Sequence, residues 1–98
     1  MKPIVIFEDD SELATFEAIN KGYRGDVIVQ IGDNAYKVYI TSMTRLLQDF
    51  EQEVAESGFY LPEHNTIIVQ EVTRSEIECT IERLYRCKYF ESINALGV

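Results

Sequence analysis

The side chains best suited to chemistry in this chain are carboxylates, and four of them stand within five residues: Glu8, Asp9, Asp10 and Glu12. Clustered carboxylate oxygens can hold Mg²⁺ or Ca²⁺. The cluster lacks the central glycine and the distant bidentate glutamate of a calcium-binding EF-hand loop. Capping of a following helix by Asp9 or Asp10, together with solvated charge, explains it more simply. We therefore predict no metal site, and an acidic rim for a basic partner is the functional alternative.

A second acidic group, formed by Asp49, Glu53 and Glu56, recurs at helical spacing beside an apolar stripe. The pattern predicts an amphipathic helix that ends at Gly58. The stripe consists of Leu46, Leu47, Phe50 and Val54. Acid–base catalysis needs two carboxyl groups in differing environments. Asp49 and Glu53 would both be solvated, so we predict no catalytic residue among them.

Histidine and cysteine offer little further chemistry. His64 is the only histidine, so a zinc site built from histidines is excluded. Cys79 and Cys87 would be about 12 Å apart along one helix, which is too far for a disulfide. A Cys-His nucleophile pair is formally possible, but packing beside a buried helical stripe is the favoured role for both thiols. We predict no cofactor and no enzymatic activity.

The charge balance restricts the partners. Seventeen Asp and Glu against nine Lys and Arg give a formal net charge of −8 on 98 residues. Nucleic acids and anionic membranes bind through Lys and Arg, so we expect neither as a partner. A basic protein surface would be attracted. The alternative is that the charge only keeps a small domain in solution.

The expected location is the cytoplasm. No apolar run approaches the roughly 20 residues that span a bilayer. The segment 8–10 interrupts the apolar stretch near the N-terminus, which argues against a signal peptide. Two cysteines do not make a secreted disulfide framework, and they fit reduced thiols.

The periodicity predicts one α+β domain over residues 1–98, with residues 92–98 frayed. Strands are expected at 3–7, 27–31, 36–40 and 66–72, with a hairpin turn at 32–34. Helices are expected after the first acidic cluster, before Gly58, and after a capping box at 73–76. The order β-α-β-β-α-β-α matches the split βαβ, or ferredoxin-like, antiparallel sheet with an extra C-terminal helix. The alternative is another mixed α+β two-layer sandwich.

Two functions fit this sequence. The first is a small, non-enzymatic protein-interaction module, of the inhibitor or immunity type, that binds a basic partner through both acidic groups. The second is a small-ligand-binding or oligomeric regulatory domain, with its site at a sheet edge or between protomers near Tyr36, Tyr39 and Tyr60. A homo-oligomer is compatible with either function. No resemblance to a known family is specific enough to transfer residues.

Overall fold

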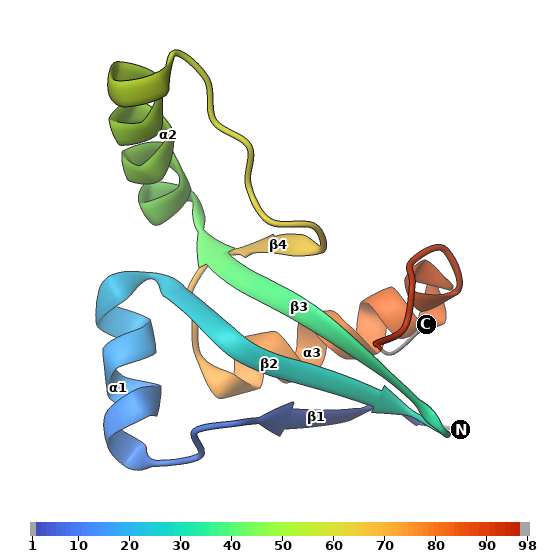
Figure 1. Ribbon diagram of the computed structural model, residues 1–98. Helices are drawn as coiled ribbons and strands as arrows, with labels where there is room; N and C mark the ends of the chain where they lie inside the picture. The colour runs from blue at the N-terminus through green and yellow to red at the C-terminus, as the bar shows by residue number, and fades with distance from the viewer. Residues whose placement is uncertain (1, 97–98) are drawn as a thin grey trace.

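Four strands form one mixed sheet in the order β1-β2-β3-β4, as the computed structural model of residues 2–96 shows (Figure 1). The strands β1 to β3 pair antiparallel, and β4 lies parallel to β3. The bounds are β1 Ile4–Phe7, α1 Glu12–Lys21, β2 Tyr23–Ile31, β3 Asn34–Ser42, α2 Met43–Ser57, β4 Thr66–Val69, α3 Arg74–Arg86 and the short 3-10 helix η1 Tyr89–Glu91. The ferredoxin-like antiparallel order is therefore wrong, and the broader prediction of a small mixed α+β fold is confirmed.

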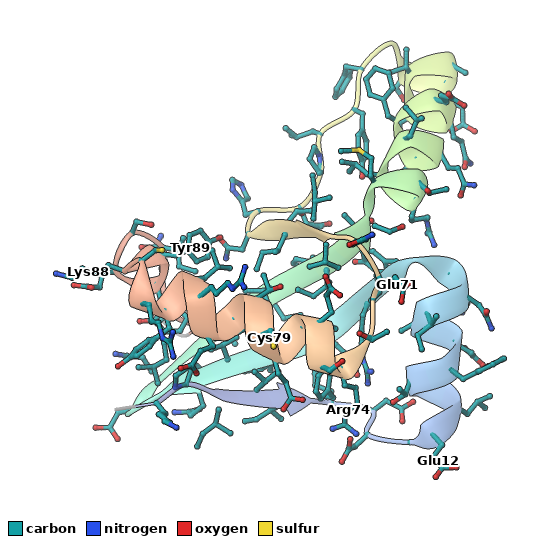
Figure 2. The ribbon with its side chains drawn as sticks, turned by 180° about the vertical axis from the view of Figure 1, so that it is seen from behind. Glu12, Glu71, Arg74, Cys79, Lys88 and Tyr89 are labelled. Carbon is teal, nitrogen blue, oxygen red and sulfur yellow. The ribbon has the colours of Figure 1, made fainter. Side chains whose placement is uncertain are left out.

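The hydrophobic core lies on one face of the sheet, beneath α3. Val27 and Val29 alternate inward from β2, and Val38 and Ile40 do so from β3, all without solvent exposure. The helix α3 crosses this face, as Figure 2 shows from behind, and fully buries Ile77 and Ile81. Residues on the same strand face alternate with period two, so this arrangement places Ile28 and Tyr39 on the opposite, helix-free face.

The positions of the helices differ from those of a split βαβ fold. That fold packs its two crossover helices on the sheet, whereas here α3 covers the core face. The first helix, α1, buries only Ala18, and α2 buries no side chain. Both of these helices stand at the end of the sheet (Figure 1). β1 and β2 are neighbours in an antiparallel pair, where the split βαβ fold would separate them.

The helix caps follow local sequence rules. Ser11 caps α1 by accepting a hydrogen bond from the Ala14 N–H at 3.1 Å, so the expected cap at Asp9 or Asp10 is wrong by one or two residues. Thr73 caps α3 through the Glu76 N–H, as predicted. Gly58 ends α2 in the left-handed conformation, also as predicted.

Gly22 fixes the junction between the two outlying helices. It ends α1 with φ of +68°, and its carbonyl oxygen accepts a hydrogen bond from the Ser42 N–H at 2.8 Å. A Cβ atom on Gly22 would lie 2.5 Å from the Ser42 hydroxyl, which caps α2. Only glycine fits this close approach, and the contact sets where α2 leaves the sheet.

The C-terminal segment is anchored to the body over its described part. Phe90 in η1 is buried and lies 5.2 Å from Tyr36, measured between ring centroids. Ile93 and Ala95 pack against the core, and the Leu96 N–H donates to the Ala35 carbonyl oxygen at 2.6 Å. Residues 92–96 thus differ from the expected fraying, and residues 97–98 lie outside the described part. Among residues 2–96 the structure holds no helix with the length and apolarity to cross a bilayer.

Candidate functional site

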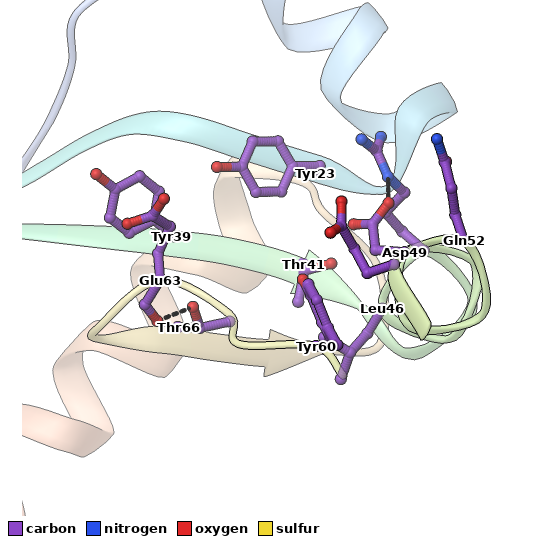
Figure 3. Close-up of a pocket in the computed structure, with 11 residues that line it drawn as sticks. Tyr23, Tyr39, Thr41, Leu46, Asp49, Gln52, Tyr60, Glu63 and Thr66 are labelled. Carbon is purple, nitrogen blue, oxygen red and sulfur yellow. Dashed lines mark hydrogen bonds and ion pairs between the residues drawn. The ribbon is translucent and has the colours of Figure 1, made fainter. Parts of the chain in front are cut away.

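A cleft of about 330 Å³ lies between the helix-free face of the sheet, α2 and the segment that returns from α2 to β4 (Figure 3). Its walls combine tyrosine rings with carboxylates. The lining residues are Tyr23, Tyr39, Thr41 and Thr66 from the sheet, Arg45, Leu46, Asp49, Gln52 and Glu53 from α2, and Tyr60 and Glu63 from the returning segment. Three carboxylates face one guanidinium, so the cleft is negatively charged.

The strand register places the sheet side of the cleft. Tyr23 on β2 is paired with Thr41 on β3, and Tyr39 on β3 is paired with Thr66 on β4. All four positions belong to the face that α3 leaves free. The parallel pairing of β4 with β3 therefore completes this wall of the cleft.

Helical spacing places the α2 side. Arg45, Asp49 and Glu53 follow one another at four-residue intervals and so share one side of the helix. Arg45 Nε donates to Asp49 Oδ1 at 2.9 Å, and its Nη1 donates to the Lys21 carbonyl oxygen at 3.1 Å. The same guanidinium lies over the Tyr23 ring, with Cζ 5.5 Å from the ring centroid. These contacts tie the base of α2 to the end of α1 and to the sheet.

The returning segment is held by hydrogen bonds at its end. The Asn65 side-chain amide donates to the Lys37 carbonyl oxygen at 3.1 Å, and the Tyr39 N–H donates to the Asn65 carbonyl oxygen at 3.1 Å. The Thr66 hydroxyl donates to the Glu63 carbonyl oxygen at 2.5 Å. This anchoring brings Glu63 to the Tyr39 side of the cleft (Figure 3).

The tyrosine hydroxyls report the electrostatics of the cleft. Partial burial, followed by the negative charges of Asp49 and Glu53, raises the pKa of Tyr60 above its ordinary value. The pKa of Tyr23 is raised mainly by burial and further by Tyr39 and Glu63, against an opposing effect of Arg45. Burial disfavours the charged form of each hydroxyl, and the nearby carboxylates add to this effect because they are negatively charged.

The first acidic group, residues 8–10 and 12, forms ion pairs and hydrogen bonds with other parts of the protein. Glu8 pairs with Lys37 at 2.8 Å, and Asp10 pairs with Arg74 at 2.6 Å. The Asp9 carboxylate accepts the Ser11 N–H at 3.2 Å. Two of these four carboxylates are therefore neutralised by a nearby cation, and the group stabilises the β1–α1 connection.

Only part of the second acidic group, Asp49, Glu53 and Glu56, belongs to the cleft. Asp49 and Glu53 line it, whereas Glu56 lies exposed farther along α2. The two groups are not brought together, because Glu12 lies at the end of α1 remote from α2 (Figures 1 and 2). The assignment of all seven residues to one partner stays a prediction, and no residue of the first group lines the cleft.

Sequence reasoning missed Tyr23, Arg45 and Glu63 as members of the site. It named Tyr39 and Tyr60 only for a small-ligand site, together with Tyr36. Tyr36 lies on the core face and is buried. A signal was present in the four-residue spacing of Arg45 with the acidic residues of α2. Glu63 carried no such signal, because its position depends on the anchored end of the returning segment.

The cysteines and the histidine lie away from the cleft lining. Cys79 and Cys87 are free and exposed, so the expected packing of both thiols beside the core is wrong. His64 is exposed in the returning segment. No group of three or more His, Cys, Asp or Glu side chains in residues 2–96 converges to hold a metal ion.

Comparison of the chain with protein-family models, curated proteins and solved structures gives no match. The function is therefore argued from the geometry of this chain.

Proposed function

We propose that this protein is a non-enzymatic interaction module that binds a basic protein partner through the acidic cleft and the adjoining acidic side of α2. The observation that carries the proposal is the arrangement of Asp49, Glu53 and Glu63 around tyrosine rings, where Arg45 is the single cation that lines the cleft among residues 2–96. Charge complementarity of this kind accelerates encounter and disfavours wrong partners. The net charge of −8 adds a long-range attraction for a basic surface.

The shape of the α2 region supports an interface. The helix stands away from the sheet with no buried side chain (Figure 1), and its apolar residues Met43, Leu47 and Phe50 are 60%, 53% and 48% exposed. Apolar side chains beside a charged surface are the usual composition of protein interfaces. Glu53 and Glu56 form no ion pair within 4 Å among residues 2–96, so both carboxylates are free to meet a cation.

Charge reversal at α2 tests this function. We expect the double variant Glu53→Lys/Glu56→Lys to bind the basic partner about tenfold or more weakly, because two attractive contacts become repulsive. The measurement immobilises each variant, captures binding proteins from native lysate at low salt, and compares the captured species quantitatively.

The matched control is Glu78→Lys/Glu91→Lys, which makes the same charge change at two exposed positions on and after α3. A basic protein retained by the wild type and the control but lost by the α2 variant supports the proposal. Equal loss from both variants would contradict it, because net charge alone would then explain the binding.

The oligomeric alternative rests on other side chains of the sheet face that forms one wall of the cleft. Ile4, Ile6 and Ile68 are 61%, 42% and 48% exposed, and alternation places them on the helix-free face of the sheet. An exposed apolar face of this kind suits a second copy of the chain. Light scattering that gives a monomeric mass at high protein concentration would contradict this alternative and leave the cleft proposal intact.

A further inference from the structure

We infer that the cleft accepts one arginine side chain of the partner, with the guanidinium between the tyrosine rings and the free carboxylates. This inference rests on the proposed function and specifies its ligand chemistry. At about 330 Å³ the cleft lies at the small end of ligand pockets. That volume suits one long side chain better than a folded peptide segment.

The aromatic walls provide the first part of this chemistry. Tyr23, Tyr39 and Tyr60 enter the cleft from β2, β3 and the returning segment, so their rings approach it from different sides (Figure 3). Tyrosine faces attract guanidinium groups within about 6 Å of the ring centroid. The planar guanidinium can also stack on a ring, which an ammonium group cannot do.

The carboxylates provide the second part. Asp49 already forms an ion pair with Arg45. Glu53 and Glu63 form no ion pair within 4 Å in the described part of the chain. They come from α2 and from the returning segment, so they flank the cleft from two elements. Guanidinium has five donors in a fixed fork and can bond carboxylates while its face meets a ring.

Two contacts within the protein show that its tyrosines and carboxylates already bind cations together. Arg45 lies over Tyr23 at 5.5 Å while bonding Asp49 at 2.9 Å. Lys37 lies 5.6 Å from the Tyr39 ring centroid while bonding Glu8 at 2.8 Å. These pairs lie at and beside the cleft, and a partner arginine would repeat their chemistry on Tyr60, Glu53 and Glu63.

The same geometry argues against a metal ion as the occupant. Within residues 2–96 no three ligating side chains converge. Glu63 lies on the Tyr39 side of the cleft, apart from Asp49 on α2 (Figure 3), and this spread of the carboxylates favours a large, flat organic cation.

The test titrates the whole protein with N-acetyl-arginine amide and follows tyrosine ring signals by NMR. We expect saturable shifts of Tyr23, Tyr39 and Tyr60 with a dissociation constant on the order of 1 mM. The buried Tyr36 and the α3 residue Tyr85 serve as internal references that should not move. N-acetyl-citrulline amide, which is uncharged and of similar shape, should produce no saturable shift.

Two variants at one position sharpen the result. Tyr60→Ala should weaken arginine amide binding several-fold, whereas Tyr60→Phe, which keeps the ring, should bind nearly as the wild type does. N-acetyl-lysine amide, which carries an ammonium group, should bind more weakly than the arginine compound. The inference would be overturned by equal shifts with the citrulline compound, by equal binding of the lysine compound, or by shifts spread over all six tyrosines. If these occur while Glu53→Lys/Glu56→Lys still loses the partner, only the arginine site fails. If that variant keeps the partner, the proposed function fails, whether or not N-acetyl-arginine amide binds.

Discussion

Asp26→Asn is expected to lower the free energy of unfolding by about 3 kcal/mol, because it leaves the buried Arg24 guanidinium without its counter-ion. Arg24 is 4% exposed, and its Nε donates to Asp26 Oδ1 at 2.8 Å. Its Nη2 donates to the Asp9 carbonyl oxygen at 2.8 Å, and its Cζ lies 4.2 Å from the Phe7 ring centroid. Urea denaturation of both proteins measures the difference.

The stability losses of the two single variants and of the double variant distinguish this buried pair from an ordinary surface pair. Arg24→Met should cost less than Asp26→Asn, because Asp26 has a side chain 26% exposed and can be hydrated when left alone. The double variant Arg24→Met/Asp26→Asn should recover part of the loss caused by Asp26→Asn, since no unpaired charge then stays buried. Additive losses in the double variant would show that the two side chains act independently.

The same pair predicts an acid-side loss of stability. Burial by itself would raise the pKa of Asp26, but the hydrogen bonds from Arg24 and from the Asp9 N–H hold it below the ordinary value of 3.8. A depressed pKa in the folded state contributes stability that is present above 3.8 and is lost as the pH falls through the folded pKa. The Asp26→Asn variant should show a shallower loss of stability over this acid range.

Ile77→Ala is the second large effect that we expect, with a loss of about 3 kcal/mol in the free energy of unfolding. Ile77 has no solvent exposure and lies on α3, the helix that covers the core face. Truncation removes buried contacts and leaves a cavity against the sheet. The control on the same helix is Cys79→Ala, an exposed position where we expect a change within about 0.5 kcal/mol. Equal effects at both positions in urea denaturation would contradict this placement of α3.

Local features of the fold could be predicted from the sequence because neighbouring residues determine them. Val27, Val29 and Ile31 alternate as a strand, Thr73 caps a helix, and Gly58 ends one. The strand order could not be predicted in this way. It depends on how all three helices pack against the sheet, which residues distant in sequence decide together.

The candidate site was predictable only in part for a related reason. The acidic side of α2 is visible in the spacing of Asp49 and Glu53. The neutralisation of Asp10 depends on Arg74, which is distant in sequence. The approach of Glu63 to Tyr39 depends on the parallel pairing of β3 with β4. Tertiary pairing therefore determines which carboxylates form ion pairs among residues 2–96 and which do not.

The most direct measurement uses the basic protein captured from lysate, after its purification. Isothermal titration calorimetry at increasing salt gives its affinity for the wild type, for Glu53→Lys/Glu56→Lys and for Glu78→Lys/Glu91→Lys. A partner held by charge at α2 and the cleft should bind the wild type and the α3 control with affinities that fall steeply as salt rises. The α2 variant should bind weakly even at low salt. An affinity that is indifferent to salt and equal in all three proteins would contradict recognition of a basic partner by this surface.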